Sequence, residues 1–513
     1  MTEYVIGCDV GSQGTKAALL ALDGTLAGEA SAGYAIDYPH PLWAEQPVSR
    51  WIDALTTAVG RLLATTGVRP EQVRALGLAT QVDGVVPIDA AGQPLRPAII
   101  WMDRRASDQC DAARRAIDGA HAFQLTGLNL DASHVAPKIR WIAEHQPDIY
   151  AQAAYFLLPG SYLAYYLTGE IAVDYSNASS TLLMDVRSRS WSPEMCALFG
   201  IEAGRLGPIA AATAPLGTLR PAVAAALGLR PETLVVAGCG DEHAACLGAG
   251  VVRPGLAGDI AGTAEPVCAA SQQPSFDPSG LVETHCHADP DLWLLENPGF
   301  VSGGNMRWYR DNFSPQEISA AAEGSVSAYA LLDDQAARIA PGAEGVIFLP
   351  CLMGAMAPTW NESARGAFFG FTLAHTRDHF TRAVLEGSAY AVRDITDQMQ
   401  TIGLELKQLR VVGGGARSRL WNQIKADVTG LLVTVPQTTE TTALGGALLA
   451  LVGIGAYDTL AQACDRVVRI GDQFEPQPRA QVAYAELYQL YRQVYFSLLP
   501  AFDEAARIDR HTR

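Results

Sequence analysis

The chain opens with an alternation of apolar runs and turns that predicts three β-strands. The first run covers residues 3–10 and contains Asp9 near its end, and a small-residue turn follows at 11–14. A second apolar run spans 15–22, and Asp23-Gly24 is a hairpin signal before a third run. The small-residue loop therefore joins two strands, and such a loop presents backbone N–H groups to an anion without bulky side chains in the way.

Apolar runs that end in glycine turns recur in both halves of the chain. Residues 74–80, 234–237 and 409–412 each predict a buried strand. Helical spacing follows at 48–66, 242–250, 418–429, from 442 onward and from 480 onward. A strand that runs into a glycine turn in each half indicates two related α/β domains that face one cleft. We place their boundary near residue 250, which gives domains 1–250 and 251–513.

Composition narrows the possible partners and the compartment. The 513 residues are 49% apolar and 18% charged, which is typical of an ordered globular protein. A formal net charge of −17 argues against nucleic acid and anionic membranes as partners. Nine cysteines without framework spacing suit a reducing cytoplasm, and the uncharged, glycine-interrupted stretch 443–457 is too short to span a bilayer.

The opening loop carries the first candidate chemistry. Ser12 and Lys16 offer a hydroxyl and an ammonium group to an anion, and Asp9 at the end of the first strand is placed to hold a hydrated Mg²⁺, which usually accompanies ATP. The spacing is neither a Walker loop nor a dinucleotide fingerprint. The alternative is an ordinary tight hairpin with a buried turn acid.

Four segments in order resemble the ATP-binding motifs of the FGGY carbohydrate kinases. They are 9–16 (DVGSQGTK), 238–241 (GCGD), 262–263 (GT) and 413–418 (GGGARS). Segments 39–46, 101–104, 136–141 and 364–370 also look like family segments, and the first of these is most similar to the xylulokinase branch. The resemblance extends over nearly the whole chain.

The resemblance implies the two-domain, actin-like (ribonuclease-H-like) α/β fold, with ATP in the cleft between the halves and the sugar held mainly by the N-terminal domain. It assigns nucleotide contacts in both halves and Mg²⁺ to Asp9. The expected β- and γ-phosphate contacts are Ser12, Gln13, Lys16 and Thr263, Gly262 is a further expected nucleotide contact, and the expected adenosine contacts are Gly414, Gly415 and Ala416.

Asp241 is the best candidate for the base that phosphoryl transfer requires. It follows a turn of two glycines and a cysteine, so that its carboxylate can project into the cleft, and it starts a helix whose N-terminus is expected to keep it ionised. From the residues alone, an N-cap aspartate is the commoner role at such a position. The resemblance favours the base.

The sugar pocket departs from the xylulokinase pattern. Val82-Asp83 replaces the typical Met-His, Glu242 replaces an Asn after the catalytic Asp, and 354–358 lacks the frequent Gly-Glu-Arg. Asp83 can accept two sugar hydroxyls, or it is a turn acid before Gly84. Trp101 and Asp103 are expected to wall the sugar, with a core tryptophan and a helix N-cap as the alternatives.

The resulting expectation is a cytoplasmic kinase, a homodimer, that transfers phosphate from MgATP to a terminal hydroxyl of a ketopentose such as D-xylulose. Alternatives are a kinase of ribulose, erythritol or glycerol, an ATP-driven clamp of the actin or chaperone type, and a sugar-sensing pseudokinase.

Overall fold

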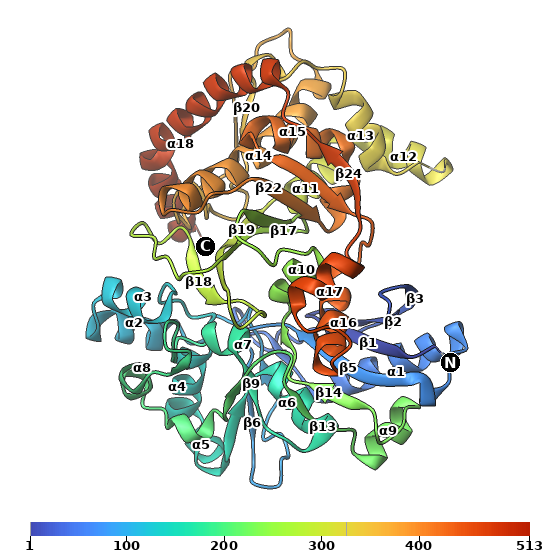
Figure 1. Ribbon diagram of the computed structural model, residues 1–513. Helices are drawn as coiled ribbons and strands as arrows, with labels where there is room; N and C mark the ends of the chain where they lie inside the picture. Colours follow the sequence, from blue (N-terminus) through green and yellow to red (C-terminus); the bar gives the residue numbers. More distant parts are fainter. Residues whose placement is uncertain (1, 325, 513) are drawn as a thin grey trace. The chain divides into compact units, whose positions relative to one another are not determined.

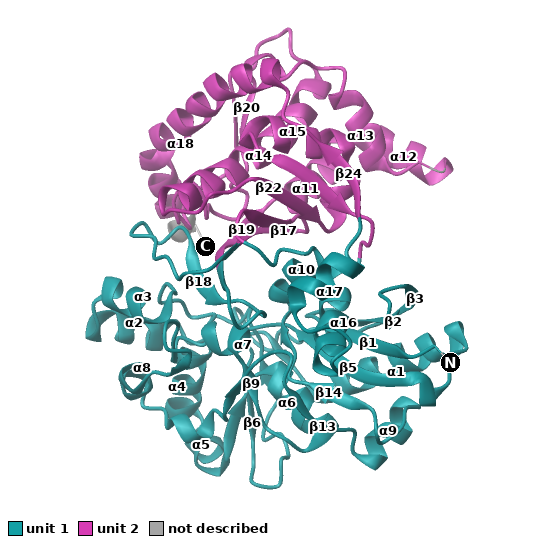
Figure 2. Ribbon diagram, viewed as in Figure 1, with its two compact units in different colours: residues 1–253, 270–294, 440–469 teal, residues 254–269, 295–439, 470–513 magenta. Residues whose placement is uncertain are grey.

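A computed structural model describes residues 2–324 and 326–512 and divides the chain into two compact units (Figure 2). Unit 1 comprises Met1–Arg253, Ala270–Leu294 and Glu440–Arg469, and unit 2 comprises Pro254–Ala269, Leu295–Thr439 and Ile470–Arg513. The expected division at residue 250 stays a prediction, because compactness does not by itself define a domain that folds alone. Within the described residues, no helix is long and apolar enough to cross a membrane.

The sheet of unit 1 has the strand order β13-β14-β5-β1-β2-β3, with β15 paired to the end of β5 (Figure 1). β1 runs antiparallel to β2 and parallel to β5, and β15 continues beside β5 in parallel. The strands are β1 (Tyr4–Val10), β2 (Gly14–Ala21), β3 (Leu26–Gly33), β5 (Val73–Thr80), β13 (Pro215–Thr218), β14 (Leu234–Val236) and β15 (Cys239–Gly240). The three opening strands and the strand at 74–80 were predicted and are confirmed.

Helix α16 (Thr441–Gly453) explains why a late segment of the chain belongs to unit 1. Its backbone lies so close to the sheet and to α10 (Asp241–Gly248) that only glycine fits at the contacts. A Cβ atom on Gly7 would lie 1.9 Å from the Ala443 carbonyl oxygen, and one on Gly77 would lie 2.0 Å from that of Gly446. The apolar stretch expected to be too short for a membrane is thus a buried helix that packs on β1 and β5.

The remaining helices of unit 1 cover the sheet or form a second core between residues 85 and 293. Helix α1 confirms the helix predicted at 48–66; its apolar side, which includes Trp51 and Leu55, is buried. The helices are α1 (Val48–Thr66), α2 (Ser107–Ala116), α3 (Gly119–Thr126), α4 (Val135–His145), α5 (Pro147–Gln152), α6 (Pro159–Thr168), α7 (Tyr175–Ser179), α8 (Pro193–Phe199), α9 (Pro221–Leu227), α10 (Asp241–Gly248), α16 (Thr441–Gly453) and α17 (Leu460–Val467). The short paired strands are β4 (Glu45–Gln46) with β7 (Ala98–Ile99), β6 (Val86–Ile88) with β8 (Tyr155–Leu157), β9 (Val173–Asp174) with β12 (Ile209–Ala210), and β10 (Met184–Asp185) with β11 (Ser190–Trp191).

The second sheet repeats the plan of the first. Its order is β18-β19-β17-β16-β22-β23-β24, and β16 runs antiparallel to β17 and parallel to β22, as β1 does to β2 and β5. The strands are β16 (Leu256–Ile260), β17 (Ala264–Ser271), β18 (Glu283–Cys286), β19 (Trp293–Val301), β22 (Gln408–Val412), β23 (Leu432–Pro436) and β24 (Ile470–Phe474), and β20 (Ile347–Leu349) pairs separately with β21 (Ala367–Phe369). The helices of unit 2 are α11 (Gly303–Phe313), α12 (Pro315–Glu323), α13 (Ala328–Ala336), α14 (Arg377–Thr401), α15 (Arg419–Thr429) and α18 (Pro478–Thr512). The expectation of two related α/β halves is borne out by this repeated order.

Candidate active site

Hydrogen bonds to its backbone carbonyl oxygens hold the loop between β1 and β2 on one side and leave its other side open. The Tyr34 hydroxyl donates to the carbonyl oxygens of Gly11 and Gly14, at 2.5 and 3.3 Å. The Gln46 side-chain amide donates to the Ser12 carbonyl oxygen at 2.7 Å. Ser12 is half-buried and Gln13 is exposed. A loop held in this way can keep its polar groups in place for an anion.

Asp9 and Lys16 stand opposite each other on β1 and β2. The Lys16 ammonium group pairs with the carboxylate of Glu440, just before α16, at 2.5 Å. Partial exclusion from water raises the pKa of Asp9 to about 7, an effect that the charge of Lys16 opposes and that of Glu440 reinforces. A further cation beside Asp9 would favour its ionised form.

Asp241 lies at the same sheet edge as Asp9. Cys239 in β15 pairs with Ala79 in β5, and Ala79 pairs in turn with Asp9 in β1. Because these three strands are parallel, the side chains that follow their carboxyl ends gather at one edge. The N-cap of α10 is Gly240, so Asp241 is not an N-cap aspartate; its carboxylate accepts from the Glu242 N–H at 3.0 Å.

The expectation that the helix N-terminus keeps Asp241 ionised is wrong for the chain alone. Removal from bulk water and the negative charges of Glu242 and Asp9 raise the pKa of Asp241 well above its ordinary value. The backbone N–H groups lower it but do not offset these effects. A cation at this edge would favour the ionised form.

Asp83 follows β5 at the same edge and is held in an unusual conformation. Its φ of 58° lies in the left-handed region, which non-glycine residues adopt at a cost of about 1 kcal/mol or more. The Lys138 ammonium group donates to the Asp83 carbonyl oxygen at 2.6 Å, and His134 Nδ1 lies 3.3 Å from Asp83 Oδ2. Val82 Cγ1 would lie 2.6 Å from a Cβ atom on Gly240, so the Val82 side chain faces the residue before Asp241.

Trp101 and Asp103 differ in their surroundings. Trp101 is 41% exposed, which excludes the core alternative, and its indole N–H donates to Ser12 Oγ at 2.8 Å. Asp103 is fully buried, accepts from the Ala44 N–H at 2.6 Å and pairs with Arg105 at 2.7 Å. The N-cap of α2 is Ala106, which excludes the helix N-cap as the role of Asp103. The sugar contact of Asp103 stays a prediction, whereas its observed bonds brace the segment that carries Trp101.

Sequence reasoning assigned no role to His134, Lys138, Tyr34 or Glu440. A histidine and a lysine within an otherwise apolar segment are a signal of buried charge, since lysine is almost never fully buried unpaired. Tyr34 and Glu440 carry no such signal, because strand and helix packing alone bring them to the loop.

The glycine segments of unit 2 come together in space. The Gly415 N–H donates to the Ala261 carbonyl oxygen at 2.9 Å, which joins the turn after β22 to the turn after β16. A Cβ atom on Gly414 would meet nothing within 4 Å, so that position is open. Thr263 is exposed, and Gly262 and Ala416 are half-buried. This part of the predicted nucleotide site therefore forms one surface of small residues.

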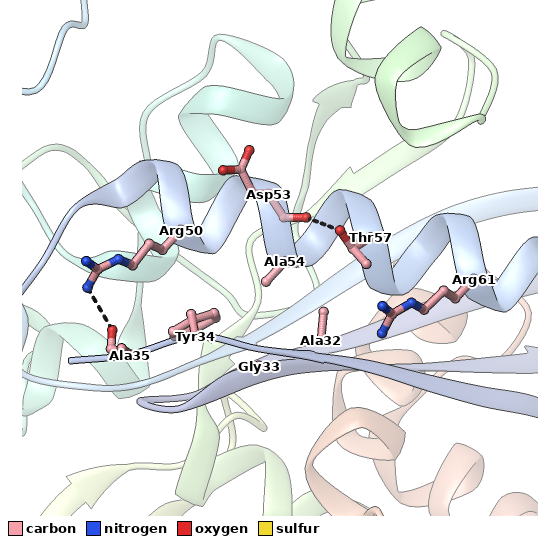
Figure 3. A pocket seen from close by; sticks show the side chains of 9 residues that line it. All are labelled: Ala32, Gly33, Tyr34, Ala35, Arg50, Asp53, Ala54, Thr57 and Arg61. Atoms are coloured by element: carbon pink, nitrogen blue, oxygen red, sulfur yellow. Dashed lines mark hydrogen bonds between the residues drawn. The ribbon is translucent and has the colours of Figure 1, made fainter.

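A separate cavity of about 450 Å³ lies between the end of β3 and α1 (Figure 3). Arg50 and Arg61 line it, and Arg50 donates to the Ala35 carbonyl oxygen at 2.9 Å. Tyr34 lines the cavity and also donates its hydroxyl hydrogen to the backbone of the β1–β2 loop. None of the predicted site residues lines this cavity.

The residues present fit Mg²⁺ only in company with a phosphate. Within 2–324 and 326–512, no three histidine, cysteine or acidic side chains gather to hold a metal. Mg²⁺ is usually bound through one or two carboxylates together with substrate phosphates and water. Asp9, beside a loop shaped for an anion, matches that arrangement.

Comparisons with known proteins agree with this geometry. Models of the N-terminal and C-terminal domains of the FGGY family of carbohydrate kinases match residues 4–248 and 260–454. The xylulose kinase of Escherichia coli (strain K12) is 32% identical over 496 residues, 96% of this chain and 99% of that protein. The gluconokinase of Bacillus subtilis (strain 168) is 29% identical over 511 residues, 99% of this chain and 96% of that protein. The crystal structure of the Rhodospirillum rubrum xylulose kinase matches with a TM-score of 0.88 at 30% identity, covering 98% of this chain and 100% of that one. The predicted family and its two-domain actin-like fold are confirmed.

Proposed function

The chain belongs to the FGGY family of carbohydrate kinases and is an ATP-dependent sugar kinase, and we propose that its substrate is a neutral ketopentose of the D-xylulose type. The observation that carries the proposal is that three acids meet at one sheet edge. Asp9 lies near the end of β1, Asp83 follows β5 and Asp241 follows β15, and these strands are adjacent and parallel. Phosphoryl transfer requires a metal ligand and a base for the attacking hydroxyl; we assign these roles to Asp9 and Asp241, and sugar binding to Asp83.

The proposed nucleotide contacts divide between the units. In unit 1, the β1–β2 loop with Ser12 and Gln13 meets the terminal phosphates, and a phosphate competes with Glu440 for Lys16. In unit 2, Gly262 and Thr263 meet phosphate, and the small residues Gly414, Gly415 and Ala416 meet adenosine. Mg²⁺ held by Asp9 supplies charge neutralisation of the phosphates.

The proposed chemistry uses Asp241 as the general base. Its carboxylate takes the proton from the terminal hydroxyl of the sugar as that oxygen attacks the γ-phosphate. A carboxylate whose pKa is raised is a stronger base once it is ionised. Trp101 and Glu242 border the same edge and are proposed to orient the sugar.

The relatives include kinases of a neutral sugar and of a sugar acid, and the charge at Asp83 favours the neutral one. Asp83 Oδ1 is buried and has no hydrogen-bond partner within the described chain. A sugar hydroxyl would donate to it, whereas the carboxylate of gluconate would face a like charge. Gluconate is the second candidate, because the Bacillus subtilis gluconokinase is nearly as similar as the xylulose kinases.

A coupled ADP-release assay tests the proposal with D-xylulose, D-ribulose, D-gluconate, erythritol and glycerol. We expect the highest kcat/KM with D-xylulose or D-ribulose, the two neutral ketopentoses of the panel, and little ATP hydrolysis without sugar. A preference for gluconate would overturn the neutral-substrate proposal. We further propose a cytoplasmic homodimer; nine cysteines that are all buried and lack framework spacing support a reducing compartment.

A further inference from the structure

We propose that His134, as an imidazolium ion paired with Asp83, is a positioning residue that aims the free carboxylate oxygen of Asp83 at the hydroxyls of a neutral sugar. The inference rests on the proposed role of Asp83 in sugar binding. It adds a residue of the loop before α4 to a site otherwise built from the ends of strands.

The geometry leaves Asp83 with one oxygen held and one oxygen free. His134 Nδ1 lies 3.3 Å from Oδ2, and both side chains are about nine-tenths buried, at 8% and 10% exposed. Oδ1 has no partner among the described residues. A buried polar atom without a partner is unfavourable, so this oxygen is suited to a ligand that donates a hydrogen bond.

The same stretch of chain also holds the backbone of Asp83. Lys138, four residues beyond His134, donates to the Asp83 carbonyl oxygen at 2.6 Å. This bond retains the left-handed backbone at Asp83, and the His134 contact retains its side chain. One short segment therefore holds both the backbone and the side chain of Asp83, as expected for a preorganised binding group.

The charges around His134 favour its protonated form. Burial lowers its pKa, but the carboxylates of Asp83, Glu283 on β18 and Asp131 in its own loop raise it to about 9. Lys138 is the cation in this cluster, and burial lowers its pKa to about 8. His134 is thus charged at neutral pH and loses its proton as the pH rises through about 9. Above that pH its pull on Asp83 weakens.

The test compares His134→Gln with His121→Gln, a matched change at an exposed histidine that pairs with Glu194. With the preferred sugar of the panel above, we expect His134→Gln to raise the sugar KM by about tenfold or more, because it removes the buried ion pair with the Asp83 carboxylate. Its kcat and ATP KM should stay within about twofold of the parent, since a positioning group acts on sugar binding. His134→Lys, which keeps a cation, should recover part of the affinity, and His121→Gln should change nothing.

A pH series and a second variant keep the outcomes distinct. The sugar KM of the parent should rise near pH 9, and this rise should be missing in His134→Gln, whereas any change near pH 8 from loss of the Lys138 proton should remain in both proteins. If His134→Gln fails to fold, the parent pH series decides alone, and a flat KM would overturn the inference. If Asp83→Asn raises the sugar KM while His134→Gln does not, only this inference fails. If Asp83→Asn leaves the sugar KM unchanged, the proposed role of Asp83 fails.

Discussion

Replacing Gly445 by alanine tests how tightly the site depends on the packing of α16. Gly445 lies within α16 and faces α10, the helix that Asp241 begins. A Cβ atom at this position would lie 2.1 Å from the Ala244 carbonyl oxygen, three residues after Asp241. The obstacle is backbone on a buried helix, so a side-chain rotation cannot relieve it.

The expected effect follows from two opposed contributions. Alanine favours a helix interior by about 1 kcal/mol over glycine. Ordinary contact needs roughly 3.4 Å or more, so α10 and α16 must separate by over about 1 Å, and overpacking of this kind costs about 1–3 kcal/mol or more. The obstacle is backbone, so we take the upper end of the overpacking cost and expect a net loss near 2 kcal/mol in the free energy of unfolding. Because a shift of about 1 Å misplaces a catalytic group, we also expect kcat to fall by about a hundredfold.

Urea unfolding and the coupled kinase assay measure both effects, with Gly60→Ala as the control. Gly60 is exposed within α1 of the same unit, and a Cβ atom there meets nothing within 4 Å. Gly60→Ala should therefore stabilise the chain by about 0.5–1 kcal/mol and leave kcat unchanged. If Gly445→Ala were as stable and as active as Gly60→Ala, the close packing of α16 would not position Asp241.

Two further changes probe the two units separately. Lys425 is fully buried between Asp259 and Glu265. Lys425→Met should lower the free energy of unfolding in urea by about 3–5 kcal/mol, because it leaves two buried acids without a cation. Neutralising both acids in the same chain should restore most of the loss, and an unchanged urea midpoint for the single variant would contradict this interpretation. Trp101→Phe removes the indole N–H that reaches Ser12 and should lower kcat/KM by about five- to tenfold. Ser12→Ala should cost a similar amount, and the two changes together should be less than additive; full additivity would show that the bond has no role.

The periodic parts of the chain were predictable because each was a local pattern. The strands before the glycine turns, the helix at 48–66 and the turns themselves follow from apolar spacing and small residues. The return of α16 to the first unit was not predictable from spacing. It depends on glycines at Gly7 and Gly77 that meet a helix more than 350 residues later, a contact that no local pattern encodes.

The acidic residues of the site could be identified from the sequence, but their protonation and their partners could not. The position at a helix start suggested an ionised Asp241, whereas removal from water, and then the charges of Glu242 and Asp9, raise its pKa. Likewise, the sequence showed Asp83 as a departure from the family pattern. It did not show the left-handed backbone of Asp83, nor its partner His134, which lies in a loop about fifty residues further along the chain. Sequence gives the chemical groups, and strand register determines which of them interact.

The turnover of Asp241→Asn tests the central claim most directly, measured beside Asp53→Asn, an exposed acid on α1. With saturating sugar and MgATP, we predict that kcat falls by roughly a hundred- to ten-thousandfold for Asp241→Asn, because the general base is lost. ATP binding, measured by calorimetry, should remain within about threefold of the parent, since the carboxylate acts on the sugar hydroxyl. Asp53→Asn should match the parent, and an Asp241→Asn enzyme with parental kcat would contradict the account.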